Sequence, residues 1–233
     1  MQINGTTALV TGANRGLGRR FAQALLDRGA TKVYASARNP ASIDLPGVIP
    51  VRLDITDPAQ VDAAAEQASD VDLLINNAGS GTHATLLGGD IADVRLEMET
   101  HYFGTLAMAR AFAPVLAANG GGTMANVLSV LSWVSSPAAD AYSAAKAAEL
   151  SLTNALRVAL ADQKTLVTGL HVGYMDTDMA AHVTEPKSDP LVIANLLLDG
   201  IEAGQPEVVA DDVSRTVRAA LSGPLSALYP QVA

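Results

Sequence analysis

Short apolar runs alternate with longer stretches of helical periodicity along the whole 233-residue chain. The apolar runs, which we interpret as strands, cover residues 6–12, 31–37, 48–55, 71–79, 121–129, 165–173 and 207–210. The helical patterns cover residues 19–29, 58–68, 92–118, 141–160, 190–204 and 211–223. Strand–helix alternation implies right-handed crossovers and a parallel sheet with helices on both faces. The sequence therefore predicts one α/β domain over residues 1–233, with a doubly wound sheet of about seven strands.

The composition is consistent with a largely buried sheet and excludes several classes of function. Apolar residues make up 49% of the chain and charged residues 17%, below the roughly 25% typical of soluble domains. The net charge of −9 argues against nucleic acid or an anionic membrane as a partner, since both bind basic surfaces. The absence of cysteine excludes disulfides, thiol catalysis and zinc–thiolate sites, and we predict no metal site.

The N-terminal sequence MQINGTTALVTG has no basic region followed by an apolar stretch, so no signal peptide is expected. No run reaches the ~18 uninterrupted apolar residues that would suggest a membrane span. We therefore expect a soluble, cytoplasmic protein.

Residues 176–189 form the longest stretch without clear periodicity, and they follow the sixth expected strand. Ligands of doubly wound sheets bind beyond the carboxyl ends of the strands. Long unpatterned loops at such places are commonly functional. We therefore expect a substrate lid around residues 176–189.

A glycine-rich loop, TGANRGLG at residues 11–18, connects the first expected strand to the first helix. Gly12, Gly16 and Gly18 give the spacing GxxxGxG, which is neither GxGxxG nor a P-loop. Glycine permits a tight turn and close backbone approach, and a helix N-terminus offers free N–H groups to a phosphate. Three glycines also suit an ordinary strand–helix connection, but their place after the first strand of an α/β pattern favours a dinucleotide site.

The end of the second expected strand indicates which dinucleotide would bind. Where dinucleotide folds often carry an acid for the ribose hydroxyls, this chain has Ala37 and Arg38. A carboxylate would repel a 2′-phosphate, whereas a guanidinium binds it through two hydrogen bonds. Arg15, in the glycine loop, could reach the same phosphate. Either arginine alone could be an ordinary surface residue, but together they favour NADP(H) over NAD(H).

Tyr142 and Lys146 lie four positions apart in an alanine-rich helix, so both side chains project from one face. Such a pair often arises by chance, and an exposed, solvated pair is one interpretation. The other is an acid–base group, because a nearby ammonium lowers a tyrosine pKa from its usual value of about 10.

Five motifs, in order along nearly the whole chain, resemble those of the short-chain dehydrogenase/reductase family. They are the glycine loop, Asp54, the NNAG sequence at residues 76–79, the group of Ser129, Tyr142 and Lys146, and the pair of Gly173 and Thr177. The interval from Ser129 to Tyr142 is the one usual in this family. The resemblance implies a Rossmann-like fold and an oxidoreductase that transfers a hydride between NADP(H) and a carbonyl or alcohol substrate.

The resemblance implies a catalytic role for three residues. Tyr142 would be the general acid/base, Lys146 would lower its pKa and bind the nicotinamide ribose, and Ser129 would stabilise the substrate oxygen. His101 stands where the family usually carries an asparagine that opens a water path to the lysine. We count His101 with the catalytic residues as part of a proton relay, although it could instead be a core histidine at a helix kink.

The resemblance also implies how the cofactor is held. Asp54 and the backbone of Ile55 would contact the adenine, and Thr177 would hold the nicotinamide carboxamide. Asn76, Ala78 and Gly79 would line the adenosine ribose. Val172 replaces the usual proline before Gly173, and we expect only a small effect on cofactor binding. The expected cofactor-binding residues are Gly12, Asn14, Arg15, Gly16, Leu17, Gly18, Arg38, Asp54, Ile55, Asn76, Ala78, Gly79, Tyr142, Lys146, Gly173 and Thr177.

The loops expected around the substrate, at residues 80–83, 131–133 and 174–175, are mostly small or apolar and contain no arginine or lysine. An anionic group would lack a partner there, so we expect a small uncharged carbonyl or alcohol substrate. The long fourth helix and the helix of Tyr142 are apolar on more than one face. Since family members often pair through these helices, the resemblance implies a homodimer or homotetramer.

Two other readings of the sequence remain open. A non-catalytic NADP(H)-binding sensor or interaction protein could use the same fold, and only His101 favours it. A sugar-nucleotide epimerase shares the pair of Tyr142 and Lys146, but it normally needs a larger C-terminal domain, for which no residues are available.

Overall fold

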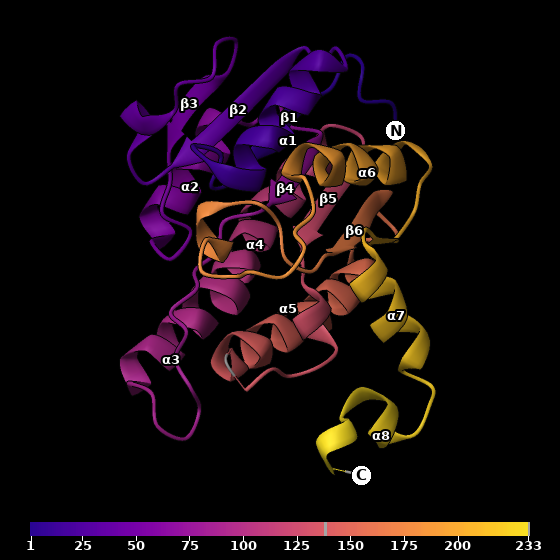
Figure 1. Cartoon of the computed structure of the whole chain (residues 1–233). Coiled ribbons are helices and arrows are strands. Elements are labelled where there is room, and N and C mark those ends of the chain that lie inside the picture. The colour runs from indigo at the N-terminus through magenta and orange to yellow at the C-terminus, as the bar shows by residue number, and fades with distance from the viewer. Residues whose placement is uncertain (138, 233) are drawn as a thin grey trace.

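The computed structural model describes residues 1–137 and 139–232 and contains a seven-stranded parallel sheet in the order β3-β2-β1-β4-β5-β6-β7 (Figure 1). All seven strands lie inside the apolar runs that the sequence predicted as strands, so the predicted doubly wound α/β fold is confirmed. The strands are β1 (Thr7–Val10), β2 (Lys32–Ala37), β3 (Ile49–Arg52), β4 (Leu73–Asn76), β5 (Gly122–Val127), β6 (Thr165–His171) and β7 (Glu207–Val209).

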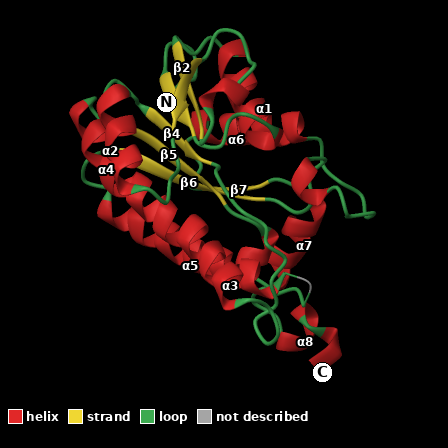
Figure 2. Ribbon diagram, turned by 90° about the vertical axis from the view of Figure 1, so that its left-hand side faces the viewer, coloured by secondary structure: helices red, strands yellow, loops and turns green. Residues whose placement is uncertain are grey.

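Helices cover both faces of the sheet, as Figure 2 shows from the side. Helices α1 (Gly16–Asp27) and α6 (Pro190–Glu202) pack on one face. Helices α2 (Pro58–Gln67), α4 (Thr105–Ala118) and α5 (Asp140–Ala159) lie on the other. The shorter helices are α3 (Ile91–Met98), α7 (Asp212–Ala220) and α8 (Leu225–Leu228). The sequence did not predict α8.

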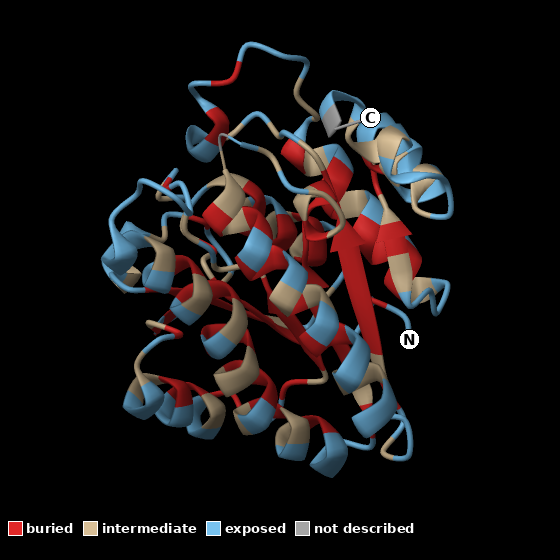
Figure 3. Cartoon of the chain, turned by 90° about the horizontal axis from the view of Figure 1, so that it is seen from below, coloured by how far each residue is buried: buried red, intermediate tan, exposed pale blue. Residues whose placement is uncertain are grey.

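The two-sided core follows from the alternation of side chains along each strand. In β4, Leu73 and Ile75 belong to the core under α1 and α6, whereas Leu74 belongs to the core under α2 and α4. All three side chains are completely buried, and Figure 3 shows strands in the buried colour between helices whose outer faces are exposed. A sheet covered on both faces explains the low proportion of charged residues in the chain.

The long helix predicted over residues 92–118 is interrupted by a π-helical turn, η2 (Glu99–Gly104), between α3 and α4. A π turn inserts an additional residue into the helical path and changes which side chains face inward. Thr100, His101 and Gly104 are buried as a result. The prediction of one regular helix was therefore wrong at the position of His101.

The strand order also fixes where a ligand can bind. Chain connections leave β1 toward β2 and leave β4 toward β5, so the loops after these two central strands diverge at their carboxyl ends. Such a switch point opens a crevice in doubly wound sheets. The glycine loop follows β1, and residues 77–79 follow β4.

Within residues 1–137 and 139–232, the helices are all too short or too polar to cross a membrane.

Candidate active site

The glycine loop connects β1 to α1. Its backbone conformation and close packing disfavour side chains at the glycine positions. Gly12 and Gly16 adopt φ values of 65° and 54°, in the left-handed region that favours glycine. A Cβ at Gly18 would collide with the carbonyl oxygen of Gly12, so the loop and the helix meet at backbone distance. No side chain caps the start of α1, which leaves its first N–H groups directed at the crevice.

Thr11 ties this loop to the end of β4. Its Oγ1 accepts hydrogen bonds of 2.9 Å from the N–H groups of both Asn77 and Ala78. The Asn77 side chain donates in return to the carbonyl oxygens of Thr11 and Gly12, at 2.8 and 3.2 Å. These bonds hold the glycine loop against the strand at the switch point.

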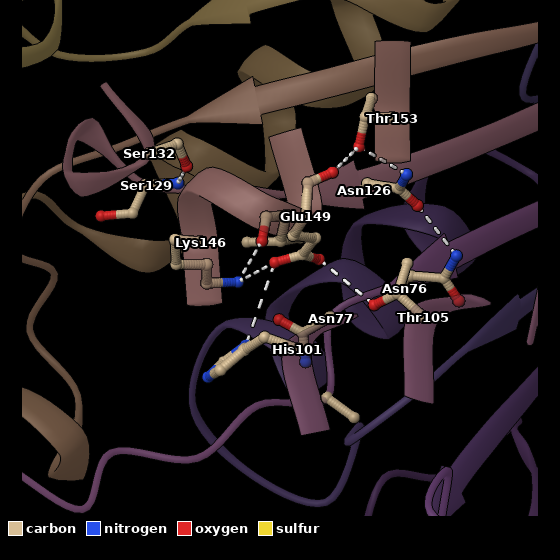
Figure 4. A network of polar contacts seen from close by, with 12 residues as sticks. Asn76, Asn77, His101, Thr105, Asn126, Ser129, Ser132, Lys146, Glu149 and Thr153 are labelled. Carbon is tan, nitrogen blue, oxygen red and sulfur yellow. Dashed lines mark hydrogen bonds and ion pairs between the residues drawn. The ribbon is translucent and has the colours of Figure 1, made fainter. Parts of the chain in front are cut away.

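Asn76 lies at the same strand end but faces the interior. Its side-chain nitrogen donates to Asn126 on β5 at 2.9 Å, and Asn126 donates to Thr153 on α5 at the same distance. Asn76 is 5% exposed, and its Oδ1 has no hydrogen-bond partner among the described residues. This chain of amides links β4, β5 and α5 (Figure 4), while a contact of Asn76 with a nucleoside stays a prediction.

Asp54 and Ile55 follow β3. Asp54 Oδ1 accepts from the N–H and the hydroxyl of Thr56, at 3.0 and 2.7 Å, which fixes the turn. Ile55 is buried against Gly104, where a Cβ would come within 2.7 Å of the isoleucine Cδ1. The π turn and the expected adenine-contacting residues are therefore in direct contact.

The two arginines that the sequence singled out differ in their surroundings. Arg38 is exposed at the end of β2. Arg15 forms a 3.3 Å ion pair with Asp178, and both side chains are more than two-thirds exposed, at 71% and 77%. Exposed pairs of this kind contribute little stability, so Arg15 is available to another anion. Arg15 and Asp178 both line a cavity of about 570 Å³.

Asn14 and Thr177 also line this cavity, together with the start of α1. Leu17 is buried in the core under α1 rather than facing the cavity. Thr177 lies against the glycine loop, since a Cβ on Gly16 would stand 3.5 Å from its methyl group. The segment 176–189 thus forms the wall opposite the loop.

Gly173 begins the connection after β6. Its N–H donates to Asp211 Oδ2 at 2.5 Å, and the other carboxylate oxygen of Asp211 accepts from Ser214 N–H at the start of α7. The turn that lacks a proline at Val172 is therefore held by Asp211 instead. Nothing in the sequence pattern distinguished Asp211 from an ordinary helix-capping residue.

Ser129 follows β5, and Tyr142 and Lys146 lie on α5. Ser129 is 7% exposed, and its hydroxyl accepts from the Leu131 N–H at 3.1 Å. Lys146 is 5% exposed, and its Nζ donates to the Val127 carbonyl oxygen at 2.7 Å, which anchors it beside the end of β5. The same nitrogen lies 5.7 Å from the centre of the Tyr142 ring. The three side chains therefore lie together at the end of β5.

The electrostatics of Tyr142 differ from the sequence-based expectation. Burial raises the pKa of Tyr142, and the Glu149 carboxylate raises it further. The Lys146 ammonium and the Ser129 hydroxyl lower it, as expected, but the net direction is upward. Burial is the largest cause of this upward direction, and the Glu149 carboxylate, which lies 2.7 Å from Lys146 Nζ, works against the effect of the ammonium.

His101 lies beneath this group in the π turn. Its ring meets the Tyr142 ring edge to face, with 5.0 Å between ring centres. His101 Nε2 lies 3.0 Å from the Ser80 carbonyl oxygen and 3.2 Å from Glu97 Oε2. Gly79 gives the ring its space, because a Cβ there would approach His101 Cε1 to 2.8 Å. His101 is thus both a residue at a kink and a neighbour of the expected catalytic group.

Two buried acids at this site escaped the sequence analysis, Glu97 and Glu149. Burial alone would raise the pKa of Glu97, but hydrogen bonds from His101, Thr82 and Ser80 outweigh it and hold the pKa at about 2. The available signal for Glu149 was its spacing of three residues from Lys146, which places both on one helix face. That spacing is usually found in exposed pairs, and burial cannot be read from it.

Comparison with known proteins places this site in a family. A model of the short chain dehydrogenase family matches residues 6–188. The chain is 30% identical to dehydrogenase/reductase SDR family member 7B of Xenopus tropicalis, over 92% of this chain and 75% of that protein. It is 26% identical to an NADP-dependent 3-hydroxy acid dehydrogenase of Schizosaccharomyces pombe, over 90% of this chain and 92% of that protein.

Among solved structures, a short chain dehydrogenase from Burkholderia cenocepacia J2315 in complex with NADP shares 41% sequence identity. It matches with a TM-score of 0.95 over 100% of this chain and 99% of that one. The family match and this likeness cover the glycine loop and the strand ends described above. The chain therefore belongs to the short-chain dehydrogenase family.

Proposed function

We propose that the protein is an NADP(H)-dependent oxidoreductase that interconverts a small uncharged carbonyl compound and its alcohol, with Tyr142 as the general acid/base. Family membership makes it an oxidoreductase of the hydride-transferring kind. The observation that carries the finer proposal is the meeting of Ser129, Tyr142 and Lys146 at the end of β5, beside the crevice.

The residues around the crevice fit a dinucleotide. The glycine loop brings backbone close to the start of α1, where uncapped N–H groups favour a pyrophosphate. Ile55 and Asp54 would hold the adenine, and Thr177 the carboxamide. When bound, the cofactor supplies or accepts the hydride.

The exposed guanidinium of Arg38, with Arg15 beside the cavity, supports NADP(H) rather than NAD(H). An arginine binds a 2′-phosphate through two charge-assisted hydrogen bonds, which an acidic residue at this strand end would prevent. The NADP bound to the Burkholderia cenocepacia relative, and the NADP dependence named for the Schizosaccharomyces pombe relative, support the same preference.

The protein's own contribution to the reaction is orientation and proton transfer. In the direction of reduction, Ser129 donates a hydrogen bond to the substrate oxygen while negative charge develops there. Tyr142 donates its proton to that oxygen. Lys146 stabilises the resulting phenolate, since the ammonium favours the charged form of the phenol. In oxidation the same proton returns to Tyr142.

Residues 176–189 serve in this proposal as a lid over the bound molecules. Two of the contacts between this segment and the rest of the site lie at the surface: the ion pair of Asp178 with Arg15, and the edge-to-face contact of His182 with His83, whose ring centres are 4.6 Å apart. All four residues are exposed. Contacts of this kind break at little cost, which suits a segment that opens and closes.

We further propose that the protein assembles as a homodimer or homotetramer through α4 and α5. Phe103, just before α4, is 49% exposed, and Val158 on α5 is 81% exposed. Burying large apolar side chains of this kind between copies removes them from water.

The proposal is tested with a panel of ketones, aldehydes and alcohols, each assayed with NADPH or NADP⁺ and with NADH or NAD⁺ by nicotinamide absorbance. We expect turnover of at least one uncharged substrate, faster with the phosphorylated cofactor. Tight NADPH binding with no turnover across the panel would instead favour a cofactor-binding sensor. Preference for a carboxylate-bearing substrate would contradict the predicted substrate class.

A further inference from the structure

Four titratable side chains meet behind Tyr142 in a region closed to solvent. Glu97 is 0% exposed, His101 1%, Glu149 2% and Lys146 5%. They come from three parts of the chain, α3, the π turn and α5. Burying charges is costly unless each is paired and hydrogen-bonded, so the contacts among them decide the state of the site.

The contacts form a continuous path from a partly exposed loop to Lys146, drawn in part in Figure 4. Glu97 accepts hydrogen bonds from the hydroxyls of Ser80 and Thr82, at 2.9 and 2.8 Å, and both donors are only partly buried. His101 Nε2 lies 3.2 Å from Glu97 Oε2. Glu149 Oε2 then lies 3.9 Å from His101 Nδ1 and 2.7 Å from Lys146 Nζ.

The surroundings of His101 fix which ring nitrogen can exchange a proton. Nε2 faces two acceptors at the shortest distances, the Glu97 carboxylate and the Ser80 carbonyl, so it carries a hydrogen. The Ser80 N–H lies farther away, at 3.4 Å. Nδ1 is buried and has no hydrogen-bond partner among the described residues. The distance from Nδ1 to Glu149 Oε2, 3.9 Å, is about 0.7 Å longer than an N–H···O hydrogen bond.

We propose that Glu149 is a positioning residue that couples Lys146 to His101, and that a His101–Glu149–Lys146 relay returns the proton that Tyr142 gives to the substrate. The relay rests on the proposed function, because it operates only if Tyr142 is the acid. Glu97 holds the His101 ring in the orientation that presents Nδ1 to Glu149.

The proton balance of the relay is simple. After Tyr142 has protonated the substrate oxygen, one proton of the Lys146 ammonium restores the phenol. The neutral amine takes a proton from Glu149 as that carboxyl accepts the Nδ1 proton of His101 in its imidazolium form, which leaves the ring neutral with its hydrogen on Nε2. One proton from solvent restores the imidazolium for each substrate oxygen protonated, so the overall reaction takes up one proton.

The simpler reading is that Glu149 only neutralises Lys146. No other carboxylate lies within ion-pair distance of Lys146 in the described part of the chain, so this role is real in either case. The two readings differ in kinetics. A broken relay slows proton delivery and makes it limit turnover, whereas lost neutralisation alone changes the charge of the pair without changing the limiting step.

The test uses Glu149→Gln in the full-length protein, with the substrate found in the panel. We expect kcat to fall about tenfold to hundredfold and the solvent deuterium isotope effect on kcat to rise, while NADPH affinity stays near that of wild type. Glu149→Asp, which keeps the carboxylate, should recover part of kcat. Glu207→Gln is the matched control, because Glu207 lies at the same 3.9 Å from a buried histidine, His171, outside the relay.

A second readout needs no substrate. The tyrosinate absorbance of the cofactor-free protein is titrated, and the Tyr142 signal is identified by difference from Tyr142→Phe. Because the Glu149 charge holds the pKa of Tyr142 up, the pair of Tyr142 and Lys146 should lose its first proton at lower pH in Glu149→Gln. Should this variant fail to fold, His101→Gln keeps the bond to Glu97 without a titratable nitrogen and should give the same isotope signature.

Three outcomes would overturn the relay. A wild-type kcat in Glu149→Gln, within about twofold, would exclude any role for Glu149 in turnover. A lower kcat with an unchanged solvent isotope effect would leave Glu149 as a neutralising residue only. Turnover by Tyr142→Phe equal to wild type would instead refute the proposed function, and the relay with it.

Discussion

At the scale of single residues, Lys146 illustrates what a sequence can and cannot indicate. Its position after Tyr142 predicted a shared helix face, and the structure confirms that both lie on α5. The sequence could not predict that Lys146 is buried with Glu149 at 2.7 Å, because burial depends on what packs above α5. The direction of the Tyr142 pKa therefore required the three-dimensional surroundings, not the motif alone.

The predicted preference for NADP(H) over NAD(H) depends mainly on Arg38. Arg38→Asp replaces a guanidinium with a carboxylate at the end of β2, where it would repel a 2′-phosphate and accept from ribose hydroxyls. We expect the Kd of NADPH to rise at least tenfold, about 1.4 kcal/mol or more, and that of NADH to fall. Fluorescence titration with both cofactors measures this.

Arg95→Asp, which makes the same change of charge at an exposed position on α3, is the control for Arg38→Asp. It should leave both cofactor affinities unchanged. Equal effects of the two variants would mean that overall charge, rather than Arg38, sets the preference.

At the scale of elements, periodicity predicted the strands well and the fourth helix less well. Each of the seven strands lies in a short apolar run of the sequence. The starts of α2 and α6 are marked by the sequences DPAQ and DPLV, in which the aspartate caps the helix and the proline is its first residue. The π turn has no such signal, since its residues ETHYFG continue a helical pattern. It packs against other parts of the chain, and one of these contacts is that of Gly104 with Ile55.

The π turn also explains how a histidine can occupy the place of the family's asparagine. Gly79 is small enough to admit the His101 ring, and Glu97, one helical turn earlier, binds its Nε2. The spacing of four residues offers Glu97 as a neighbour of His101, but Gly79 follows β4 and could not be matched to His101 from spacing. The candidate site was therefore predictable as a list of residues, but not as a set of contacts.

At the scale of the whole molecule, stability should depend on pH through His171, which is fully buried on β6. Burial lowers the pKa of His171 to about 4, whereas its ordinary value is 6.5. The unfolded chain therefore binds a proton as the pH falls through 6.5, and the folded protein does not until about 4. Stability is lost as the pH falls through this window.

Between pH 7 and pH 5 the free energy of unfolding should fall by about 2 kcal/mol from this residue alone. Urea denaturation at several pH values measures it. The folded-state pKa of Glu97, about 2, affects stability mainly below its ordinary value of 4.5, so Glu97 does not obscure this window. His171→Gln should remove the dependence, whereas His182→Gln, at an exposed position, should retain it.

The central claim is that Tyr142 transfers the proton in an NADP(H)-dependent reaction, and Tyr142→Phe tests it most directly. This variant keeps the ring that packs on His101 and removes only the hydroxyl. The account predicts that kcat falls about 10²–10⁴-fold while the Kd of NADPH changes little. Turnover at the wild-type rate by Tyr142→Phe, with the cofactor still bound, would contradict it.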